Sequence, residues 1–268
     1  MAFCRENVPY QRHMSVQMDG IDLLVDLHRK AVRQGPGGEA ETRLAIALSG
    51  LSGRRNLKIA DIGCGTGAST IILAKSLHAD ITAVDFLPDF LKELERRAKA
   101  EGVSEQITTL AASMDALTFE PSSLDAIWSE GAIYNIGFEN GIRSWRPFLK
   151  PGGILAVSEL TWLTEKRPTE LDDHWSREYP EVATASEKMA LLEAHGYTPL
   201  GYFPLSEACW LDNYYRPVQE RFEAFVTKHD NSAAARSIVE VEQLEIDLYE
   251  RFSAFVSYGF YVARKLPD

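Results

Sequence analysis

Apolar residues along the chain form two kinds of pattern, continuous runs and helical spacing. In five short runs they are nearly continuous, as in strands buried on both faces of a sheet: residues 57–62, 81–84, 107–111, 124–129 and 154–158. Between the first three runs, at residues 69–78 and 88–100, apolar residues recur at helical spacing. Strands that alternate with helices in this way predict an α/β fold with a parallel sheet and right-handed crossovers.

Helical spacing also precedes this core. Residues 21–32 and 39–51 are predicted to form helices on either side of a turn, Gly35-Pro36-Gly37-Gly38. Beyond residue 159 the alternation breaks, and residues 160–180 predict a helical or irregular insertion over the carboxyl edge of the sheet. The predicted elements that follow are a helix at 187–195 closed by Gly196, a strand at 197–205, one or two long amphipathic helices within 217–254, and a last strand at 257–264.

The charge of the chain limits its partners. The formal net charge is -11 and the sequence pI is about 5.1. A nucleic-acid-binding face needs clustered Lys and Arg, so we expect no nucleic acid partner. Three widely spaced cysteines form no disulfide framework and no Cys-x-x-Cys pair, and no apolar run has the length of a signal-peptide core or a membrane helix. We therefore expect a cytoplasmic location and no membrane partner.

No metal site is expected from the sequence. The six histidines are scattered without ligand spacing, and the compact group Asp172-Asp173-His174 consists of adjacent residues. Adjacent residues rarely converge on one ion, since a metal site also needs defined geometry and a second shell. We interpret this group as a solvated loop.

A glycine-rich loop lies between the first apolar run and the helix that follows it. Gly63, Gly65 and Gly67 have no Cβ, so the backbone can turn sharply there and approach a ligand closely. The following helix then presents unpaired N–H groups to that ligand. Gly63, Gly65 and Ala68 also satisfy the dinucleotide pattern G-x-G-x-x-G/A, so the loop alone does not identify the ligand.

Polar residues stand where the apolar runs end. In doubly wound sheets ligands bind outside the carboxyl ends of the strands, and an acidic residue about twenty positions beyond the loop can bind ribose hydroxyls. Such residues follow four of the runs: Asp61, Asp85, Ser113 to Asp115, and Ser129-Glu130. The sequence thus predicts one polar ligand site at this edge of the sheet.

These motifs resemble those of the class I S-adenosylmethionine-dependent methyltransferases. In that family an acidic residue precedes x-G-x-G-x-G, which is matched here by Asp61, Gly63, Gly65 and Gly67. Residues 149–157 look like the family's turn into its fifth strand. The resemblance covers roughly residues 40–160, and residues 128–139 resemble a branch of uncharacterised bacterial small-molecule methyltransferases, which identifies no acceptor.

The resemblance implies S-adenosyl-L-methionine as cofactor, with S-adenosyl-L-homocysteine as product. Asp61 and the glycine loop would face its amino-acid end, Asp85 its ribose, and Phe86 and the segment around Asp115 its adenine. The cofactor-binding residues implied are Asp61, Gly63, Cys64, Gly65, Gly67, Asp85, Phe86, Ser113, Met114, Asp115 and Ser129. Three of them have structural alternatives: Phe86 as core, Asp115 as the cap of a turn before Leu117, and Cys64 as a small packed residue.

Methyl transfer is an in-line displacement on an activated carbon, so the protein mainly supplies proximity and alignment. A base is needed only if the accepting group is protonated. Glu130 and Tyr134 are the first catalytic candidates, with Glu159 and His174 behind them; a structural or substrate-binding role for Glu130 is an equal alternative. Aromatic residues concentrate in the predicted substrate-facing segments, where some could surround a methylated cation although most are expected to pack: Trp128, Tyr134, Trp162, Trp175, Trp210, Tyr214 and Tyr215.

The resemblance implies a Rossmann-like sheet of seven strands, the last one antiparallel, with helices on both faces. We expect one domain with three parts: a helical lid at 1–50, a cofactor-binding half at 51–159, and substrate-side insertions with the C-terminal strands at 160–268. The expected function is methyl transfer to a small-molecule acceptor, with a homodimer possible. A nicotinamide-dependent oxidoreductase and a non-catalytic cofactor-binding protein are the alternatives, but the former does not explain Asp61, Gly67 or residues 149–153.

Overall fold

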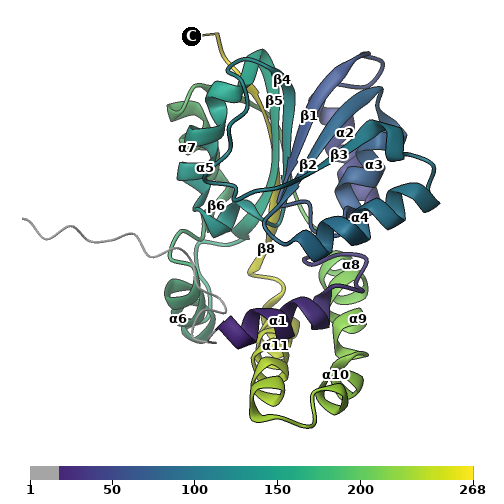
Figure 1. Cartoon of the computed structure of the whole chain (residues 1–268). Helices are drawn as coiled ribbons and strands as arrows, with labels where there is room; N and C mark the ends of the chain where they lie inside the picture. The colour runs from purple at the N-terminus through teal and green to yellow at the C-terminus, as the bar shows by residue number, and fades with distance from the viewer. Residues whose placement is uncertain (1–17, 268) are drawn as a thin grey trace, which may run out of the picture.

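The computed structural model describes residues 18–267, and a mixed sheet runs through its centre (Figure 1). The order of the main strands is β3-β2-β1-β4-β5-β8-β7, in which only β8 is antiparallel to its neighbours. Their bounds are β1 (Leu57–Ile62), β2 (Ala79–Asp85), β3 (Ile107–Ala111), β4 (Leu124–Glu130), β5 (Leu149–Trp162), β7 (Tyr197–Pro204) and β8 (Val256–Lys265). The predicted α/β sheet with an antiparallel last strand is confirmed.

An additional short strand was not predicted. β6 (Ala183–Thr184) pairs with Thr161 and Trp162 at the end of β5. This pairing is possible because β5 continues four residues beyond the predicted end at Ser158, held along residues 154–162 by its antiparallel partner β8. The sheet therefore has eight strands, with the seven predicted ones forming its main path.

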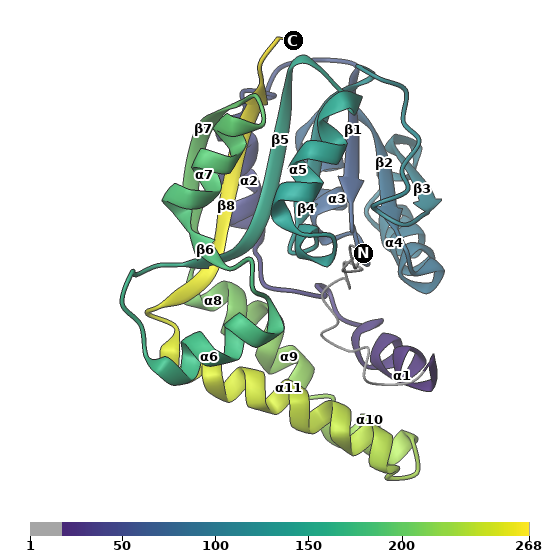
Figure 2. The same ribbon diagram turned by 90° about the vertical axis from the view of Figure 1, so that its left-hand side faces the viewer.

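Helices cover both faces of the sheet. α2 (Glu39–Ser49), α3 (Ala68–Ser76) and α4 (Pro88–Ala100) lie on one face, and α5 (Phe138–Trp145) and α7 (Ala185–Ala194) on the other (Figures 1 and 2). β1 contributes Leu57 and Ile59 to the first core and Ala60 and Ile62 to the second. Burial on both faces explains why this strand reads as a continuous apolar run.

A helical layer lies beyond the carboxyl edge of the sheet (Figure 2). Its members are α1 (Met18–His28), α6 (Thr169–Glu178), α8 (Glu207–Trp210), η4 (Leu211–Tyr215), α9 (Arg216–Gln219), α10 (Phe222–Lys228) and α11 (Ala233–Phe252). Stacked aromatic rings join these segments, with the centroids of Trp210 and Tyr249 4.4 Å apart. The expected insertion at residues 160–180 is therefore present and contains α6.

Three short single-turn helices connect other elements: η1 (Ser104–Gln106), η2 (Ile133–Asn135) and η3 (Arg146–Phe148).

The first helix prediction was wrong at its C-terminal end. α1 ends at His28 instead of residue 32, because the carbonyl groups of Ala31 and Val32 accept hydrogen bonds from Thr66 and Arg97 of the glycine loop and α4. The prediction of one or two long amphipathic helices within residues 217–254 is confirmed by one long helix, α11. A turn with left-handed backbone at Asp230 and Asn231 separates it from α10.

Candidate functional site

The glycine loop joins β1 to α3 and is closely packed on both sides. Gly63 has φ +73°, and a Cβ on it would lie 2.3 Å from the Cβ of Ala132. Gly67 has φ +84°, and a Cβ there would collide with Leu94 of α4. Both positions combine a left-handed backbone with close neighbours, so glycine is required at each. Cys64 between them is buried, and burial raises the pKa of its thiol well above the usual range, so it is a packed residue and not a thiolate.

Asp61 is a fully buried carboxyl group at the end of β1. Its Oδ2 accepts hydrogen bonds from the hydroxyl groups of Ser69 (2.8 Å) and Thr70 (2.6 Å), but its Oδ1 has no partner among the described residues. Burial, assisted by the nearby charge of Glu130, raises the pKa of Asp61 to about 7. An unpartnered oxygen on a buried carboxyl group makes this position suited to a hydrogen-bond donor or a cation.

Ser129 is a second buried polar residue without a hydrogen-bond partner in the described part of the chain. It lies near the end of β4, the strand that pairs with β1, where Trp128 is the register partner of Asp61. Unsatisfied buried polar atoms are rare in folded proteins. Asp61 and Ser129 therefore mark the ends of β1 and β4 as positions where a polar ligand would complete the hydrogen bonding.

Asp85 ends β2 and connects to the glycine loop. Its Oδ2 accepts a hydrogen bond from the backbone N–H of Gly65, and its Oδ1 accepts one from Leu87, both at 2.9 Å. Burial raises the pKa of this carboxyl group, while the backbone N–H groups that it accepts from oppose the rise. Each carboxylate oxygen retains a further lone pair, so both can accept from a ligand as well.

Phe86 follows Asp85 and is 70% exposed, so the interpretation of this residue as core is wrong. A large apolar ring left in solvent beside a carboxylate forms a flat surface on which another ring could stack. On the neighbouring strand exit, Met114 approaches the glycine loop, and its carbonyl group accepts a hydrogen bond from Trp145. The arrangement can thus bind a ligand with an aromatic ring and a hydroxyl-bearing portion.

Asp115 does not cap a turn. Its carboxylate accepts a hydrogen bond from the hydroxyl group of Ser113, and no backbone N–H group of the described residues donates to it. The turn at this point is made by the backbone of Ala116 and Ser113. The exposed carboxylate is available to a ligand donor at the end of β3.

Glu130 is surrounded by donors. Its side chain is only 6% exposed and accepts from Arg33 Nη1 (2.9 Å), Thr42 Oγ1 (2.7 Å) and Trp128 Nε1 (2.9 Å). Both oxygens are therefore engaged, and the guanidinium of Arg33 neutralises the charge. Sequence reasoning missed Arg33 and Thr42, because they lie 97 and 88 residues away and no local pattern links them to Glu130.

The segment between α1 and α2 lies on the glycine loop. Gln34 Oε1 accepts from the backbone N–H of Thr66 at 2.9 Å, and the hydroxyl group of Thr66 donates to the carbonyl group of Ala31 at 3.0 Å. Arg97 donates to the carbonyl groups of Val32 (3.0 Å) and Thr66 (2.7 Å). These side chains fasten residues 31–34 to the loop without any regular secondary structure.

The remaining acid–base candidates occupy different surroundings. Glu159 is fully buried next to the buried Lys188, and burial raises the pKa of its carboxyl group to about 7. Tyr134 is half-buried in the turn after β4 and packs edge-on against Tyr179, while His174 packs edge-on against Trp175 on α6. Only Tyr134 lies in the segment directly following Glu130.

Most of the aromatic residues expected near a substrate are packed in the interior. The buried ones are Trp128, Trp162, Trp175, Trp210, Tyr214 and Tyr215. The preference for packing is confirmed for these six. Tyr134 is the half-buried member of the set.

Residues 18–267 contain neither a metal-binding cluster nor a membrane-spanning helix. No group of three or more His, Cys, Asp or Glu side chains comes together there in a way that could hold a metal ion. In the same residues, no helix has the length and apolar character needed to cross a membrane. The polar site at the carboxyl edge is built from carboxylates, hydroxyl groups and glycine backbone.

The sequence is similar to those of known methyltransferases. A family model described as a methyltransferase domain matches residues 59–153. The 27-O-demethylrifamycin SV methyltransferase of Amycolatopsis mediterranei is 27% identical over 245 residues, covering 86% of this chain and 85% of the relative. An uncharacterized protein of Haemophilus influenzae is also 27% identical, and here the aligned region spans 61% of the relative's length.

Solved structures share the fold. A methyltransferase from Thiobacillus denitrificans in complex with S-adenosyl-L-homocysteine aligns with a TM-score of 0.76 at 17% identity, covering 91% of this chain and 96% of the other. The cyclase SpnF aligns with a TM-score of 0.72 at 18% identity, covering 97% and 98%. The strand order, the glycine loop with its acidic partners and these similarities agree: the chain belongs to the class I S-adenosylmethionine-dependent methyltransferases.

Proposed function

We propose that this enzyme methylates a small polar molecule enclosed at the carboxyl edge of the sheet. The observation that carries the proposal is the helical layer beyond this edge, which together with residues 31–34 covers the side of the glycine loop (Figure 2). The acidic charge of the chain and the small-molecule acceptor in the name of the Amycolatopsis relative support the same class of acceptor.

The residues at this edge fit S-adenosylmethionine. The unpartnered Oδ1 of Asp61 is suited to its ammonium group, and the hydroxyl group of Ser129 can bond to the same end. When Asp61 and Glu130 are both ionised, they carry two negative charges, and Arg33 neutralises one of them. The remaining negative charge complements a cofactor of net positive charge. When bound, the cofactor supplies a methyl group on a sulfonium, which is a carbon already activated for displacement.

The ribose and the adenine have matching partners in the next two strand exits. Asp85 would accept from both ribose hydroxyl groups, since its oxygens keep free lone pairs, and Phe86 would stack on the adenine. Asp115, with Ser113 and Met114 beside it, would accept from the adenine amino group. Gly63, Gly65 and Gly67 allow the backbone between Asp61 and α3 to approach the ligand, with Cys64 packed beneath.

We assign Glu130 an orienting role, because donors already occupy both of its oxygens. A carboxylate that accepts three hydrogen bonds is a fixed acceptor, and it would hold an N–H or O–H group of the acceptor in line with the methyl group. Tyr134, in the turn that follows, would close the acceptor side. Residues 29–38 would act as the lid over both ligands; residues 1–17 of the predicted lid lie outside the described residues.

Replacing Asp85 by Ala should weaken the binding of S-adenosyl-L-homocysteine by about 1.5–3 kcal/mol, the range for hydrogen bonds to a charged group. Titration calorimetry measures this difference. Asp89→Ala, in the first turn of α4, is the matched control. Asp89 pairs with Lys92 on the surface, so its replacement should leave the affinity unchanged. Equal affinity of wild type and a folded Asp85→Ala variant would remove Asp85 from the ribose role.

Added S-adenosyl-L-homocysteine should slow hydrogen exchange of the backbone amides in residues 29–38, because this segment rests on the loop that would grip the cofactor. Mass spectrometry of peptides from this segment measures the change. Peptides from α10, which lies at the end of the helical layer far from the sheet (Figures 1 and 2), should exchange at the same rate with and without the ligand. A lid role is contradicted if residues 29–38 also ignore the ligand.

The function itself is tested by turnover with S-adenosylmethionine carrying a labelled methyl group and a panel of small amines, phenols, carboxylic acids and thiols. We expect label in at least one of these. With that acceptor, Glu130→Gln should lower the single-turnover rate by about tenfold or more, the loss expected for a misaligned reactant, while the affinity for S-adenosyl-L-homocysteine stays within about twofold.

Thr42→Ser is the matched control for this change, because it keeps the hydroxyl donor to Glu130 and should react at the wild-type rate. A Glu130→Gln variant that matches wild type at saturating acceptor across pH has no part in the reaction. Label found only in protein or nucleic acid would contradict the small-molecule proposal.

A further inference from the structure

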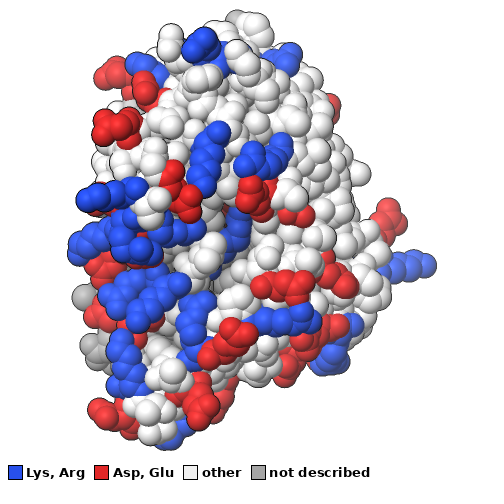
Figure 3. All heavy atoms as spheres, turned by 90° about the vertical axis from the view of Figure 1, so that its right-hand side faces the viewer, with Lys and Arg blue, Asp and Glu red and all other residues white. Residues whose placement is uncertain are grey.

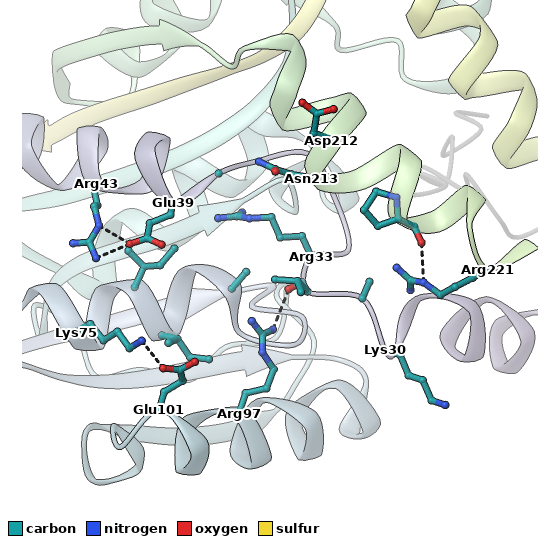
Figure 4. A pocket seen from close by; sticks show the side chains of 17 residues that line it. Lys30, Arg33, Glu39, Arg43, Lys75, Arg97, Glu101, Asp212, Asn213 and Arg221 are labelled. Atoms are coloured by element: carbon teal, nitrogen blue, oxygen red, sulfur yellow. Dashed lines mark hydrogen bonds and ion pairs between the residues drawn. The ribbon is translucent and has the colours of Figure 1, made fainter.

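A groove of about 540 Å³ opens between α2, α3, α4 and α9, away from the candidate cofactor site (Figure 4). Its lining includes none of the glycine-loop residues 63–67 and none of the polar residues at the strand exits, but it includes Arg33 and other residues of the covering segment 29–38. Its volume lies within the range of small-molecule sites. Six of its lining side chains are cationic, namely Lys30, Arg33, Arg43, Lys75, Arg97 and Arg221, and three are acidic, namely Glu39, Glu101 and Asp212.

The acidic side chains do not balance the cationic ones that face the groove. Glu39 pairs with Arg43 at 2.7 Å, and Glu101 pairs with Lys75 at 2.5 Å. Asp212 pairs with Arg216, which does not line the groove.

Arg33 is neutralised by Glu130. Lys30, Arg97 and Arg221 therefore remain, and none of the three has an ion-pair partner within 4 Å among the described residues. The net charge of the chain is -11, but three cationic side chains without an ion-pair partner lie around this one groove. Lys and Arg side chains gather on this face of the molecule (Figure 3).

The two arginines are held in place by carbonyl groups. Arg97 donates through Nη1 to the carbonyl groups of Val32 and Thr66, and Arg221 donates through Nε and Nη1 to those of Pro217 and Leu27. Partial burial lowers the pKa of both guanidinium groups, while Glu93 near Arg97 and Glu220 near Arg221 oppose this shift. Each guanidinium thus has a fixed orientation and keeps N–H groups that no neighbouring residue uses.

The wall of the groove between these cations is apolar. Ile71 and Ile72 project from α3, Pro217 lies on α9, and Val32 is 66% exposed on the connecting segment. Fixed guanidinium groups bind phosphate and carboxylate through charge-assisted hydrogen bonds, and an apolar wall beside them favours a ligand with a hydrocarbon body. An inorganic anion would use only the first of these two features.

We propose that this groove is a second ligand site, which binds a small organic anion: a phosphate or carboxylate group held by the arginines Arg97 and Arg221, with an apolar body against α3. The groove contains none of the groups assigned to the cofactor, and the two sites share only the covering segment at residues 29–38. We expect the groove to bind its ligand also when the cofactor site is filled.

The test is titration calorimetry of the full chain with phenyl phosphate and with benzoate, each in the presence of saturating S-adenosyl-L-homocysteine. We expect one saturable site for at least one of these probes, and the stronger of the two identifies the anionic group. Inorganic phosphate should bind at least about tenfold more weakly than phenyl phosphate, because it lacks the apolar body. Equal binding of inorganic phosphate would contradict the apolar part of the proposal.

Arg97→Gln and Arg221→Gln should each weaken binding of the probe by about tenfold or more, the usual loss of a charge-assisted hydrogen bond. Arg55→Gln is the matched control, because Arg55 is exposed, has no hydrogen-bond or ion-pair partner among residues 18–267, and its replacement removes the same charge. Arg97 also contacts the glycine loop, so Arg221→Gln carries the test if Arg97→Gln does not fold.

Three results would overturn the proposal: no saturable binding of either probe, equal weakening by Arg55→Gln and the groove variants, or loss of binding when S-adenosyl-L-homocysteine is present. The last result would place the anion in the cofactor or acceptor site. Methyl transfer is not needed for any of these measurements, so a failure here is distinguishable from a failure of the proposed reaction.

Discussion

The burial of Asp61 is the constraint around which the site is built. A carboxyl group removed from water favours its neutral form, so the pKa of Asp61 rises to about 7, and the contribution of this group to stability falls as the pH rises from its ordinary value of 3.8 toward 7. Ser69 and Thr70 at the start of α3 offset part of this penalty by donating to Oδ2. Oδ1 is left without a partner in the described residues, so a ligand that donates to it would complete the hydrogen bonding of this carboxyl group.

A second layer of contacts joins parts of the chain that are far apart in sequence. Gln34 binds the glycine loop, and its neighbour Arg33 binds Glu130 at the end of β4. Two adjacent side chains thus connect the exits of β1 and β4 and hold the segment between α1 and α2 over them. The same segment, through Val32, also borders the basic groove on α3, so one short stretch of chain lies between the candidate cofactor site and this groove.

Local signals predicted the core of the fold well. The bounds of α4 (Pro88–Ala100) are those predicted, because a proline at its first turn and strict helical spacing mark the helix locally. The strand exits with Asp61, Asp85 and Ser129 were predictable because each apolar run ends in a polar residue. The Arg33–Glu130 pair, the early end of α1 and the strand β6 were not, since each depends on contacts with residues far away in the sequence.

Proton release on cofactor binding tests the central claim most directly. If the ammonium group of S-adenosyl-L-homocysteine bonds to Asp61, it favours the ionised carboxylate and lowers the pKa from about 7, so the complex sheds protons and binding tightens as the pH rises from about 5.5 to about 7.5. Calorimetry at about pH 6.5 in buffers of different ionisation enthalpy measures this release. The account predicts release by wild type and by Glu159→Gln, which removes the other buried carboxyl group with a pKa of about 7, but not by Asp61→Asn. Binding without proton release in wild type, or equal release in Asp61→Asn, would contradict it.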